Sequence, residues 1–490
     1  MAEHFDVIIV GAGLSGIGAA CHLRQRCPGK SVAVLEARDA LGGTWNLFRY
    51  PGVRSDSDMY TLGYSFRPWT DGDAIADGPS ILRYIEDAAR ESGVAKDIRF
   101  RHRVVSANWD SDTARWTVRA HRADAAEDVT LTSAYLWMCT GYYRYDEGFS
   151  PAFPGAAQFQ GRLIHPQHWP ADLDYAGQQV VVIGSGATAV TLVPSLAATA
   201  GHVTMLQRSP TYIVAAPRRD PIANLVRRWL PTSTAYCVLK WKNALLDLAT
   251  YQLSRRRPSL MKALVRSNNR KQLPAGYDIE THFTPRYDPW DQRMCLSPDG
   301  DLFEAIRAGT VSVVTDVIDT FTPRGLRLKS GRELAADIVV AATGLNLLAL
   351  GGTKLSVDSR AVELSSTVSY KGMMLSGIPN LIWTLGYTNA SWTLKADLIA
   401  RYVCRLINYM DVNGFAAVTP LPPPAGERSP LIDFSSGYVR RGVATLPRQG
   451  GDVPWRLHQN YLRDRRLLTR GPLDDHVIFT RSGGSPCTAA

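Results

Sequence analysis

Two glycine-rich turns constrain the fold of this chain more than any other feature of its sequence. Each follows a short run of β-branched residues and precedes an Ala/Leu-rich helical pattern: FDVIIVGAGLSGIGAACHL begins at Phe5, and QVVVIGSGATAVTLVPSL begins at Gln179. Another apolar strand follows each helix, SVAVLE after the first and HVTMLQR after the second. Two β-α-β units of this kind predict an α/β fold with two Rossmann-like dinucleotide-binding domains.

The first turn has the pattern G-x-G-x-x-G, formed by Gly11, Gly13 and Gly16, and Glu36 ends the next strand. Such glycines let the backbone approach a pyrophosphate at a helix N-terminus, and the carboxylate accepts hydrogen bonds from ribose hydroxyls. The pattern therefore suits FAD or NAD, in which this ribose is free. The alternative is a tight glycine turn in an ordinary α/β domain.

The second turn is followed by an arginine where the first is followed by an acid. Arg208 and Ser209 lie at that position. An arginine can bind a ribose 2′-phosphate bidentately, which favours NADPH, although a solvated surface arginine is the alternative. The predicted NADPH-binding residues of the turn are Gly184, Ser185, Gly186, Ala187, Thr188, Ala189 and Val190.

NADPH beside a second dinucleotide indicates a flavoprotein in which NADPH reduces a bound flavin. The strand-end segments LWMCTGYY and VVAATGLN, each ending in T-G, are typical of places where a chain passes between two such domains. The seven cysteines are scattered and include no C-x-x-C. This excludes a disulfide reductase and a cysteine-ligated metal site, favours a reduced, cytoplasmic protein, and leaves oxygen as an electron acceptor.

Composition limits the partners. The 490 residues have 45% hydrophobic content and a formal net charge of +10, which favours phosphate-bearing ligands or a membrane surface. No nucleic-acid-binding motif is present, and no apolar run reaches the roughly 18 residues of a membrane-spanning helix. Small molecules and O2 are therefore the expected partners.

Changes of pattern along the chain predict the domain organisation. Between Arg218 and Tyr277 the sequence reads as basic amphipathic helices, which we interpret as a helical insertion. These helices could touch a membrane surface weakly or present a solvated face. The predicted ranges are an FAD-binding domain (1–145 and 339–480), an NADPH-binding domain (146–215 and 281–338), the insertion (216–280) and a disordered tail (481–490).

Two further motifs carry a family resemblance. GGTWNLFRYPGVRSD contains Gly42, Gly43, Trp45, Tyr50, Pro51, Gly52 and Asp56, and FQGRLIHPQHWP contains Phe159, Gly161, His165, Trp169 and Pro170. With the two glycine turns, they resemble the fingerprints of the type I (class B) flavin-dependent Baeyer–Villiger monooxygenases, from about Phe5 to Tyr461. GVRSDSDMYTLG, YDPWDQRMCL and GYTNASWTLKADL look most like the subgroup that contains the mycobacterial ethionamide-activating FAD monooxygenase.

The resemblance implies an enzyme that uses FAD, NADPH and O2 to convert ketones into esters or lactones through a C4a-peroxyflavin. It implies that Arg293, in WDQRMCL, is the catalytic arginine, and that Asp56 pairs with it. A fixed cation beside the flavin would stabilise the anions formed during oxygen transfer. Many family members carry Lys before this arginine, but here that position is Gln292.

The resemblance also assigns other residues. Arg54, Ser55 and Asp56 would lie where nicotinamide and flavin meet, and His165 and Trp169 would lie on the interdomain linker, where a hinge-packing histidine is the favoured interpretation. Asn389 and Trp392 would be either site-lining or packed loop residues. The residues expected to line FAD, besides the first turn and Glu36, are Ser15, Thr44, Trp45, Asn46, Leu47, Asp56 and Val104.

Three functions remain open at this point. A Baeyer–Villiger monooxygenase is favoured, and the same chemistry could oxidise sulfides or thioamides. A flavin-containing N- or S-oxygenase without ketone activity is the second possibility. The third is a redox sensor that binds flavin and NADPH without oxygenating anything.

Overall fold

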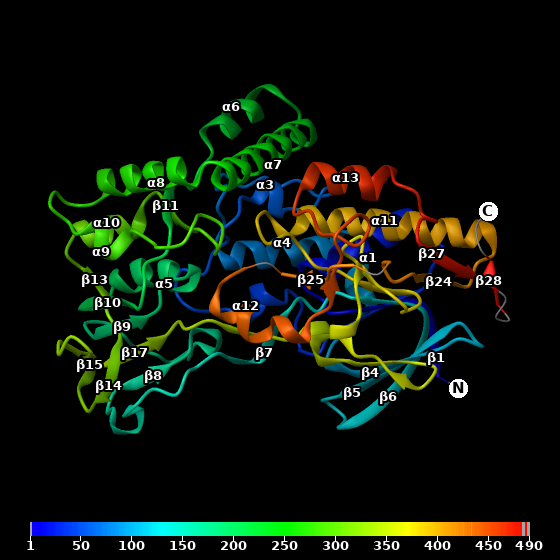
Figure 1. The fold of residues 1–490 in the computed structure, drawn as a ribbon, viewed down its shortest axis with the longest axis horizontal. Helices are drawn as coiled ribbons and strands as arrows, with labels where there is room; N and C mark the ends of the chain where they lie inside the picture. Colours follow the sequence, from blue (N-terminus) through cyan, green and yellow to red (C-terminus); the bar gives the residue numbers. More distant parts are fainter. Residues whose placement is uncertain (1, 425, 433, 483–485, 488–490) are drawn as a thin grey trace.

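The computed structural model describes residues 2–424, 426–432, 434–482 and 486–487 and contains two large sheets (Figure 1). The α/β class with two dinucleotide-binding domains is confirmed. The first sheet has nine strands, with β3, β2, β1, β6 and β23 parallel, and β5 and β4 continuing it from β6 in antiparallel pairs. Its strands are β1 (Glu3–Val10), β2 (Val32–Leu35), β3 (Ile98–Arg99), β4 (His102–Asp110), β5 (Arg115–Arg122), β6 (Glu127–Met138), β19 (Lys354–Val357), β20 (Arg360–Ala361) and β23 (Leu381–Trp383).

Helices cover one face of this sheet. Helix α1 (Leu14–Arg26) packs against α4 (Gly78–Glu91) and α11 (Trp392–Asn413), and α11 packs against α13 (Tyr461–Arg470). Strand β1 ends in VIIV, whose four residues are all buried, because both faces of a sheet are covered where parallel strands lie. One core cluster includes Val7 and Ile9, and another, on the opposite face, includes Ile8.

The second sheet has five parallel strands in the order β13-β10-β9-β17-β8. They are β8 (Arg162–Ile164), β9 (Gln179–Ile183), β10 (His202–Gln207), β13 (Val311–Thr315) and β17 (Ile338–Ala341). Helices α5 (Ala187–Ala197) and α10 (Asp301–Arg307) contact each other and share the core cluster on one side of this sheet. The cluster on the other side includes residues of a small antiparallel sheet of β14 (Ile318–Thr322), β15 (Gly325–Leu328) and β16 (Glu333–Ala335).

The chain crosses between the sheets twice, through β7 (Tyr143–Gly148) and β18 (Leu345–Leu347), which pair antiparallel. The predicted boundary between 338 and 339 is wrong, because it falls inside β17, which belongs wholly to the second sheet. The chain returns to the first sheet only after this strand.

Three helices lie where the insertion was predicted, at the top of Figure 1: α6 (Pro221–Trp229), α7 (Thr232–Arg256) and α8 (Pro258–Gln272). Helix α9 (Ile279–Phe283) begins only at the predicted end of the insertion and continues past it. Proline opens α6 and α8, and the Asp220 carboxylate caps α6 by accepting the N–H groups of Ile222 and Ala223. Strands β11 (Ile213–Ala216) and β12 (Cys295–Pro298) pair on either side of these helices and close the excursion.

Short elements complete the chain. Helices α2 (Thr44–Leu47) and α3 (Met59–Leu62) follow the first β-α-β unit. The C-terminal part adds β21 (Ser369–Tyr370), β22 (Met374–Leu375), β24 (Ala417–Pro420), β25 (Ser429–Pro430), α12 (Gly437–Gly442), β26 (Arg448–Gln449), β27 (Val477–Thr480) and β28 (Pro486–Cys487).

The expected disordered tail needs a partial correction, because β28 pairs antiparallel with β27. Residues 483–485 and 488–490 of that predicted tail lie outside the described residues. None of the helices in the described part of the chain is long and apolar enough to cross a membrane.

Candidate active site

The first glycine turn packs directly beneath the end of β6. Gly11 has a φ of +103°, and a Cβ there would lie 2.7 Å from the Cys139 carbonyl oxygen, so no larger residue fits. Gly16 lies inside α1, where a Cβ would strike the carbonyl of Gly11. The T-G segment after β6 therefore lies over the turn, and Gly16 makes the turn compact without facing a ligand.

A cavity of about 550 Å³ adjoins this turn and is lined by Gly11, Gly13, Glu36, Leu47 and Val104. The Glu36 carboxylate is 6% exposed and fixed in place, because one oxygen accepts the Ala12 N–H at 2.8 Å and the other accepts the Arg38 N–H at 2.9 Å. Each oxygen keeps a lone pair that can accept a ribose hydroxyl. The donor and acceptor chemistry fits the adenosine end of FAD.

A second cavity, of about 190 Å³, shares Gly13, Gly43, Tyr143 and Tyr145 with the first. The predicted residues that line it are Ser15, Thr44, Trp45, Ser55, Asp56 and Arg293. The two adjoining cavities form an elongated site, polar at Glu36 and aromatic at the other end. This shape fits a dinucleotide that ends in a planar ring system.

Asp56 and Arg293 form a two-point ion pair in this aromatic cavity. The Asp56 oxygens accept from the Arg293 Nε at 2.9 Å and from a terminal nitrogen at 3.0 Å. The Asp56 charge raises the pKa of Arg293 further, against the effect of burial, so the guanidinium stays charged.

The same two side chains line a third cavity, of about 450 Å³, which the insertion helix α7 helps to enclose. The ion pair therefore stands between the aromatic cavity and a space large enough for a small-molecule substrate.

Four aromatic residues line this site without having been assigned to it from the sequence. Three tyrosines were not predicted, and the position of Trp392 was left open. Tyr142, Tyr143 and Tyr145 line the aromatic cavity, and burial raises the pKa of each phenol, so each stays protonated. Trp392 lines it too, stacks on Tyr142 with ring centroids 5.5 Å apart, and donates from Nε1 to Ser15 Oγ at 2.6 Å. The available signal was the run YYRY directly after the first T-G.

Asn389 also proves to be a cavity residue. It lines the 450 Å³ cavity, and its side-chain amide donates to the Gln459 carbonyl at 2.9 Å. Of the two alternatives left open for Asn389 and Trp392, the lining position applies to both.

The second glycine turn repeats the geometry of the first. Gly184 has a φ of +137°, and a Cβ there would lie 2.4 Å from the Ala342 carbonyl oxygen, beneath the second T-G segment. A Cβ on Gly186 would meet nothing within 4 Å, so open space lies in front of this glycine. Ser185 Oγ donates to the Ser209 carbonyl at 3.1 Å, which brings the exposed Arg208 beside the turn.

The predicted residues of the helix that follows differ in exposure. Ala187 and Thr188 start α5, while the side chains of Ala189 and Val190 are fully buried in the domain core. Ala189 and Val190 therefore face away from the space in front of the turn.

Two expected positions differ in the structure. Arg54 does not reach the aromatic cavity, because it pairs with Asp301 at the start of α10 and lines a separate cavity of about 210 Å³. Asn46 is buried and does not line either cavity of the elongated site among the described residues, although its Oδ1 has no hydrogen-bond partner there.

The linker residues lie between the domains rather than in the cavities. His165 Nε2 lies 3.1 Å from the Gly344 carbonyl oxygen, Nδ1 accepts the Gln167 N–H at 3.2 Å, and burial lowers the pKa of the imidazole. A Cβ on Gly148 would lie 2.0 Å from the His165 ring, so the ring packs directly on β7. Trp169 packs against Tyr175 at the edge of the second domain core.

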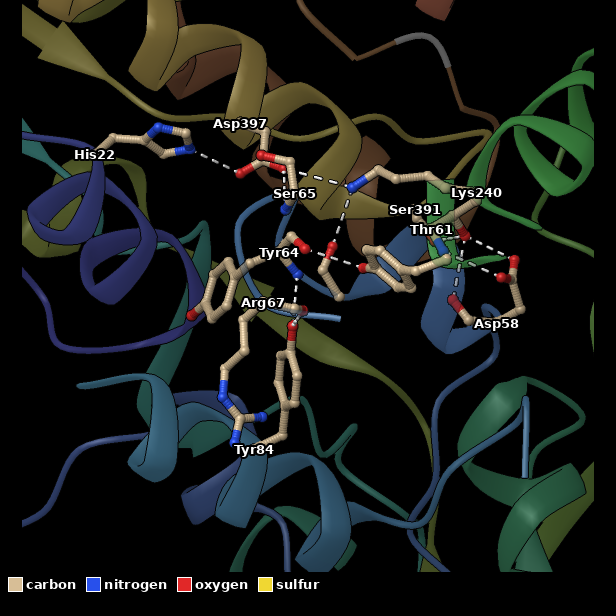
Figure 2. A network of polar contacts seen from close by, with 12 residues as sticks. His22, Asp58, Thr61, Tyr64, Ser65, Arg67, Tyr84, Lys240, Ser391 and Asp397 are labelled. Carbon is tan, nitrogen blue, oxygen red and sulfur yellow. Dashed lines mark hydrogen bonds and ion pairs between the residues drawn. The ribbon is translucent and has the colours of Figure 1, made fainter. Parts of the chain in front are cut away.

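A buried polar network ties α7 to α1, α11 and the segment around Ser65 (Figure 2). The Asp397 carboxylate on α11 accepts from His22 Nε2 at 3.1 Å, from the Ser65 N–H at 2.8 Å, and from Lys240 Nζ on α7 at 3.5 Å. Lys240 also donates to the Gly63 carbonyl at 3.1 Å. The insertion is thus fixed to the segment that directly follows Asp56.

Comparisons with known proteins identify relatives of this chain. The sequence model of the family "FMO-like: Flavin-binding monooxygenase-like" matches residues 6–350. The FAD-containing monooxygenase EthA of Mycobacterium tuberculosis is 57% identical, with 98% of each chain covered.

Two solved structures share the fold. A steroid monooxygenase bound to NADP has a TM-score of 0.75 at 22% identity, covering 98% of this chain and all of its own. A cyclohexanone monooxygenase in an open form has a TM-score of 0.71 at 22% identity, covering 86% of this chain and 90% of its own.

Proposed function

The chain belongs to the flavin-binding monooxygenase-like family, and from that premise we propose that it is a Baeyer–Villiger monooxygenase that uses FAD, NADPH and O2. One oxygen atom of O2 enters the bond between a ketone carbonyl and its neighbouring carbon, which gives an ester or lactone. The other oxygen atom leaves as water, and NADPH supplies the two electrons. Sulfides and thioamides are proposed as further substrates of the same site.

The observation that carries this proposal is the Asp56–Arg293 pair between the aromatic and the 450 Å³ cavities. Oxygen transfer to a carbonyl builds negative charge on oxygen. Arg293 can stabilise that charge, while Asp56 holds the guanidinium in position and keeps it protonated. A neutral residue at position 293 could not do this.

Names of similar proteins support the choice of cofactors and substrate class. EthA is named as FAD-containing, the steroid monooxygenase was solved with NADP, and cyclohexanone is itself a ketone. When bound and reduced by NADPH, FAD supplies the electrons that activate oxygen.

We assign FAD to the elongated site. Gly11, Gly13, Glu36 and Val104 would hold its adenosine end, and the aromatic cavity would hold its ring. We assign NADPH to the second glycine turn, with Arg208 and Ser209 at its 2′-phosphate.

Product analysis under air tests the proposal. Purified, FAD-loaded protein receives NADPH with a linear methyl ketone, or with an aryl methyl sulfide in parallel. Ester formed in proportion to NADPH consumed supports Baeyer–Villiger chemistry. Sulfoxide without ester would move the protein to heteroatom oxidation, and hydrogen peroxide as the sole product with both substrates would favour the sensor.

A further inference from the structure

The excess positive charge of this protein is confined to one segment. Residues 221–272, which form α6, α7 and α8, contain eleven Lys or Arg residues and a single acid, Asp247. The formal net charge of the whole chain is +10, so the remaining residues are balanced. A general need for anionic cofactors does not explain this distribution, because the glycine turns lie outside the segment.

The same segment carries most of the large hydrophobic side chains that are exposed in the described part of the chain. Ten of the sixteen large hydrophobic side chains that are exposed in the described part of the chain belong to it, and Trp229 is 74% exposed. Exposed apolar patches of this density mark interaction surfaces. The ten residues are Ile222, Leu225, Trp229, Leu230, Val238, Leu245, Leu246, Leu253, Leu260 and Leu264.

Helical spacing places these side chains on continuous stripes. On α6, the residues Ile222, Leu225 and Trp229 recur at intervals of three and four residues, which is about one helical turn each. On α7, the exposed residues are Val238, Leu245, Leu246 and Leu253, whereas the buried face is formed by Tyr236, Leu239 and Asn243. The exposed side chains of α7 therefore lie beside its buried face, and Leu246 at the edge of this stripe borders the 450 Å³ cavity.

The segment lies at the outer rim of the molecule. In Figure 1, α6 and α7 stand above the two sheets, and α7 contacts both α6 and α8. Exposed arginines accompany the apolar stripes, among them Arg228, Arg256 and Arg270. The combination of exposed apolar stripes and basic side chains is that of helices lying in a membrane interface.

We propose that the α6–α8 face, meaning the exposed side chains of residues 221–272, docks on an anionic lipid surface. The apolar stripes would insert among the lipid headgroups, and the basic side chains would pair with lipid phosphates. Charge decides against a second copy of the chain as the occupant. A symmetric contact would bring together two identical faces, each of which carries exposed arginines such as Arg228, Arg256 and Arg270, and these would repel each other.

Docking would also set the route of the substrate. Leu246 belongs to the exposed stripe and lines the 450 Å³ cavity that contains Arg293. The mouth of that cavity therefore lies at the docking face. This consequence rests on the proposed function, and it names the substrate class as apolar ketones and sulfides dissolved in the lipid.

Vesicle flotation of the FAD-loaded, full-length protein tests the docking. The vesicles are phosphatidylcholine alone or phosphatidylcholine with about one third phosphatidylglycerol. We expect the protein to float with the anionic vesicles and to be released by high salt, because charged contacts at a surface are screened. No flotation, or equal flotation with neutral vesicles, would overturn the proposal.

Variants separate the two contributions. Leu225→Ser/Trp229→Ser should weaken binding to anionic vesicles by about tenfold or more, because two large apolar side chains no longer insert. Arg228→Gln/Arg256→Gln should weaken it several-fold and reduce its salt dependence. The matched controls, Val317→Ser/Val412→Ser and Arg360→Gln, change exposed residues elsewhere and should bind as the unchanged protein does.

An activity assay distinguishes failure of the docking from failure of the proposed function. Leu225→Ser/Trp229→Ser should oxidise a short, water-soluble ketone at the normal rate but a long-chain ketone in anionic vesicles several-fold more slowly. If no variant oxidises either ketone, the proposed function fails, while flotation still decides the docking. A different result would overturn the proposal: the unchanged protein does not bind vesicles but self-associates, and this variant does not self-associate. That result would assign the face to contact with a second copy of the chain.

Discussion

Glu36 and Arg208 occupy corresponding positions in the two β-α-β units, and their side chains are in different environments. Glu36 is buried and held by two backbone N–H groups, which suits a fixed acceptor for ribose hydroxyls. Arg208 is exposed and directly precedes Ser209, whose carbonyl accepts a hydrogen bond from Ser185 Oγ. An acid would repel a 2′-phosphate at the second site, whereas a guanidinium attracts it.

Arg208→Ala should raise the KM for NADPH roughly tenfold and leave the KM for NADH nearly unchanged, because only NADPH carries the 2′-phosphate. Steady-state kinetics with both cofactors measures this. Arg324→Ala, an exposed arginine elsewhere in the same domain, is the control. Equal changes in both KM values would remove Arg208 from phosphate recognition.

Sequence motifs predicted individual residues best where a motif fixes the local backbone. The motif GGTWNLFRYPGVRSD contains Asp56, and the segment WDQRMCL contains Arg293. The two side chains meet although they lie far apart in the chain. Arg54, only two residues from Asp56, does not line the aromatic cavity. Its direction depends on Asp301 at the start of α10, and local sequence carries no information about such a distant partner.

At the scale of secondary-structure elements, buried polar contacts hold helix α7 to the rest of the protein. Asp397 on α11, His22 on α1 and Lys240 on α7 meet at one carboxylate. Burial by itself would raise the pKa of Asp397, but Lys240, His22 and the Ser65 N–H together lower it to about 2. The network therefore stabilises the folded protein while the carboxylate is charged.

Asp397→Asn should lower the free energy of unfolding at neutral pH by about 3 kcal/mol, because it leaves a buried lysine without its charged partner. The folded-state pKa is depressed, so this stabilisation is complete above the unfolded pKa of about 4 and is lost as the pH falls toward 2. Urea unfolding across that range measures it.

The control for this prediction is Asp411→Asn on the same helix, whose ion pair with Lys30 is partly exposed to solvent and should contribute under about 1 kcal/mol. A difference between Asp397→Asn and the unchanged protein that does not shrink below about pH 4 would contradict the account.

The sequence predicted the helical character of the insertion but not how it attaches. Basic amphipathic periodicity is a local property, whereas Lys240 and Asp397 meet only through the packing of α7 on the segment around Ser65. The same limit applies to Tyr142, Tyr143 and Tyr145, whose convergence on the aromatic cavity depends on the path of β7 between the domains.

At the scale of the whole molecule, the two linker strands β7 and β18 connect the two sheets, and His165 contacts both crossings. Its ring lies on Gly148 at the end of β7 and its Nε2 lies 3.1 Å from the carbonyl oxygen of Gly344, just before β18. The ring thus touches both crossings. Changes in the angle between the domains would have to disturb these contacts.

His165→Ala should lower kcat roughly tenfold while the FAD content and the ester formed per NADPH stay unchanged, because domain motion and not chemistry is affected. Steady-state kinetics with product quantification measures both quantities. His121→Ala, on the exposed part of β5, is the control. An unchanged kcat with more hydrogen peroxide per NADPH would place His165 in the oxygenation step instead.

The central claim is that the Asp56–Arg293 pair makes this protein an oxygenating enzyme, and the ester formed per NADPH in Arg293→Ala tests it most directly. We expect about one ester per NADPH in the unchanged protein and in the surface control Arg360→Ala. Arg293→Ala should keep its FAD and still oxidise NADPH, but form less than about 1% of that ester, as when a preorganised charge beside the reacting oxygen is removed. Full ester formation by Arg293→Ala would contradict the account.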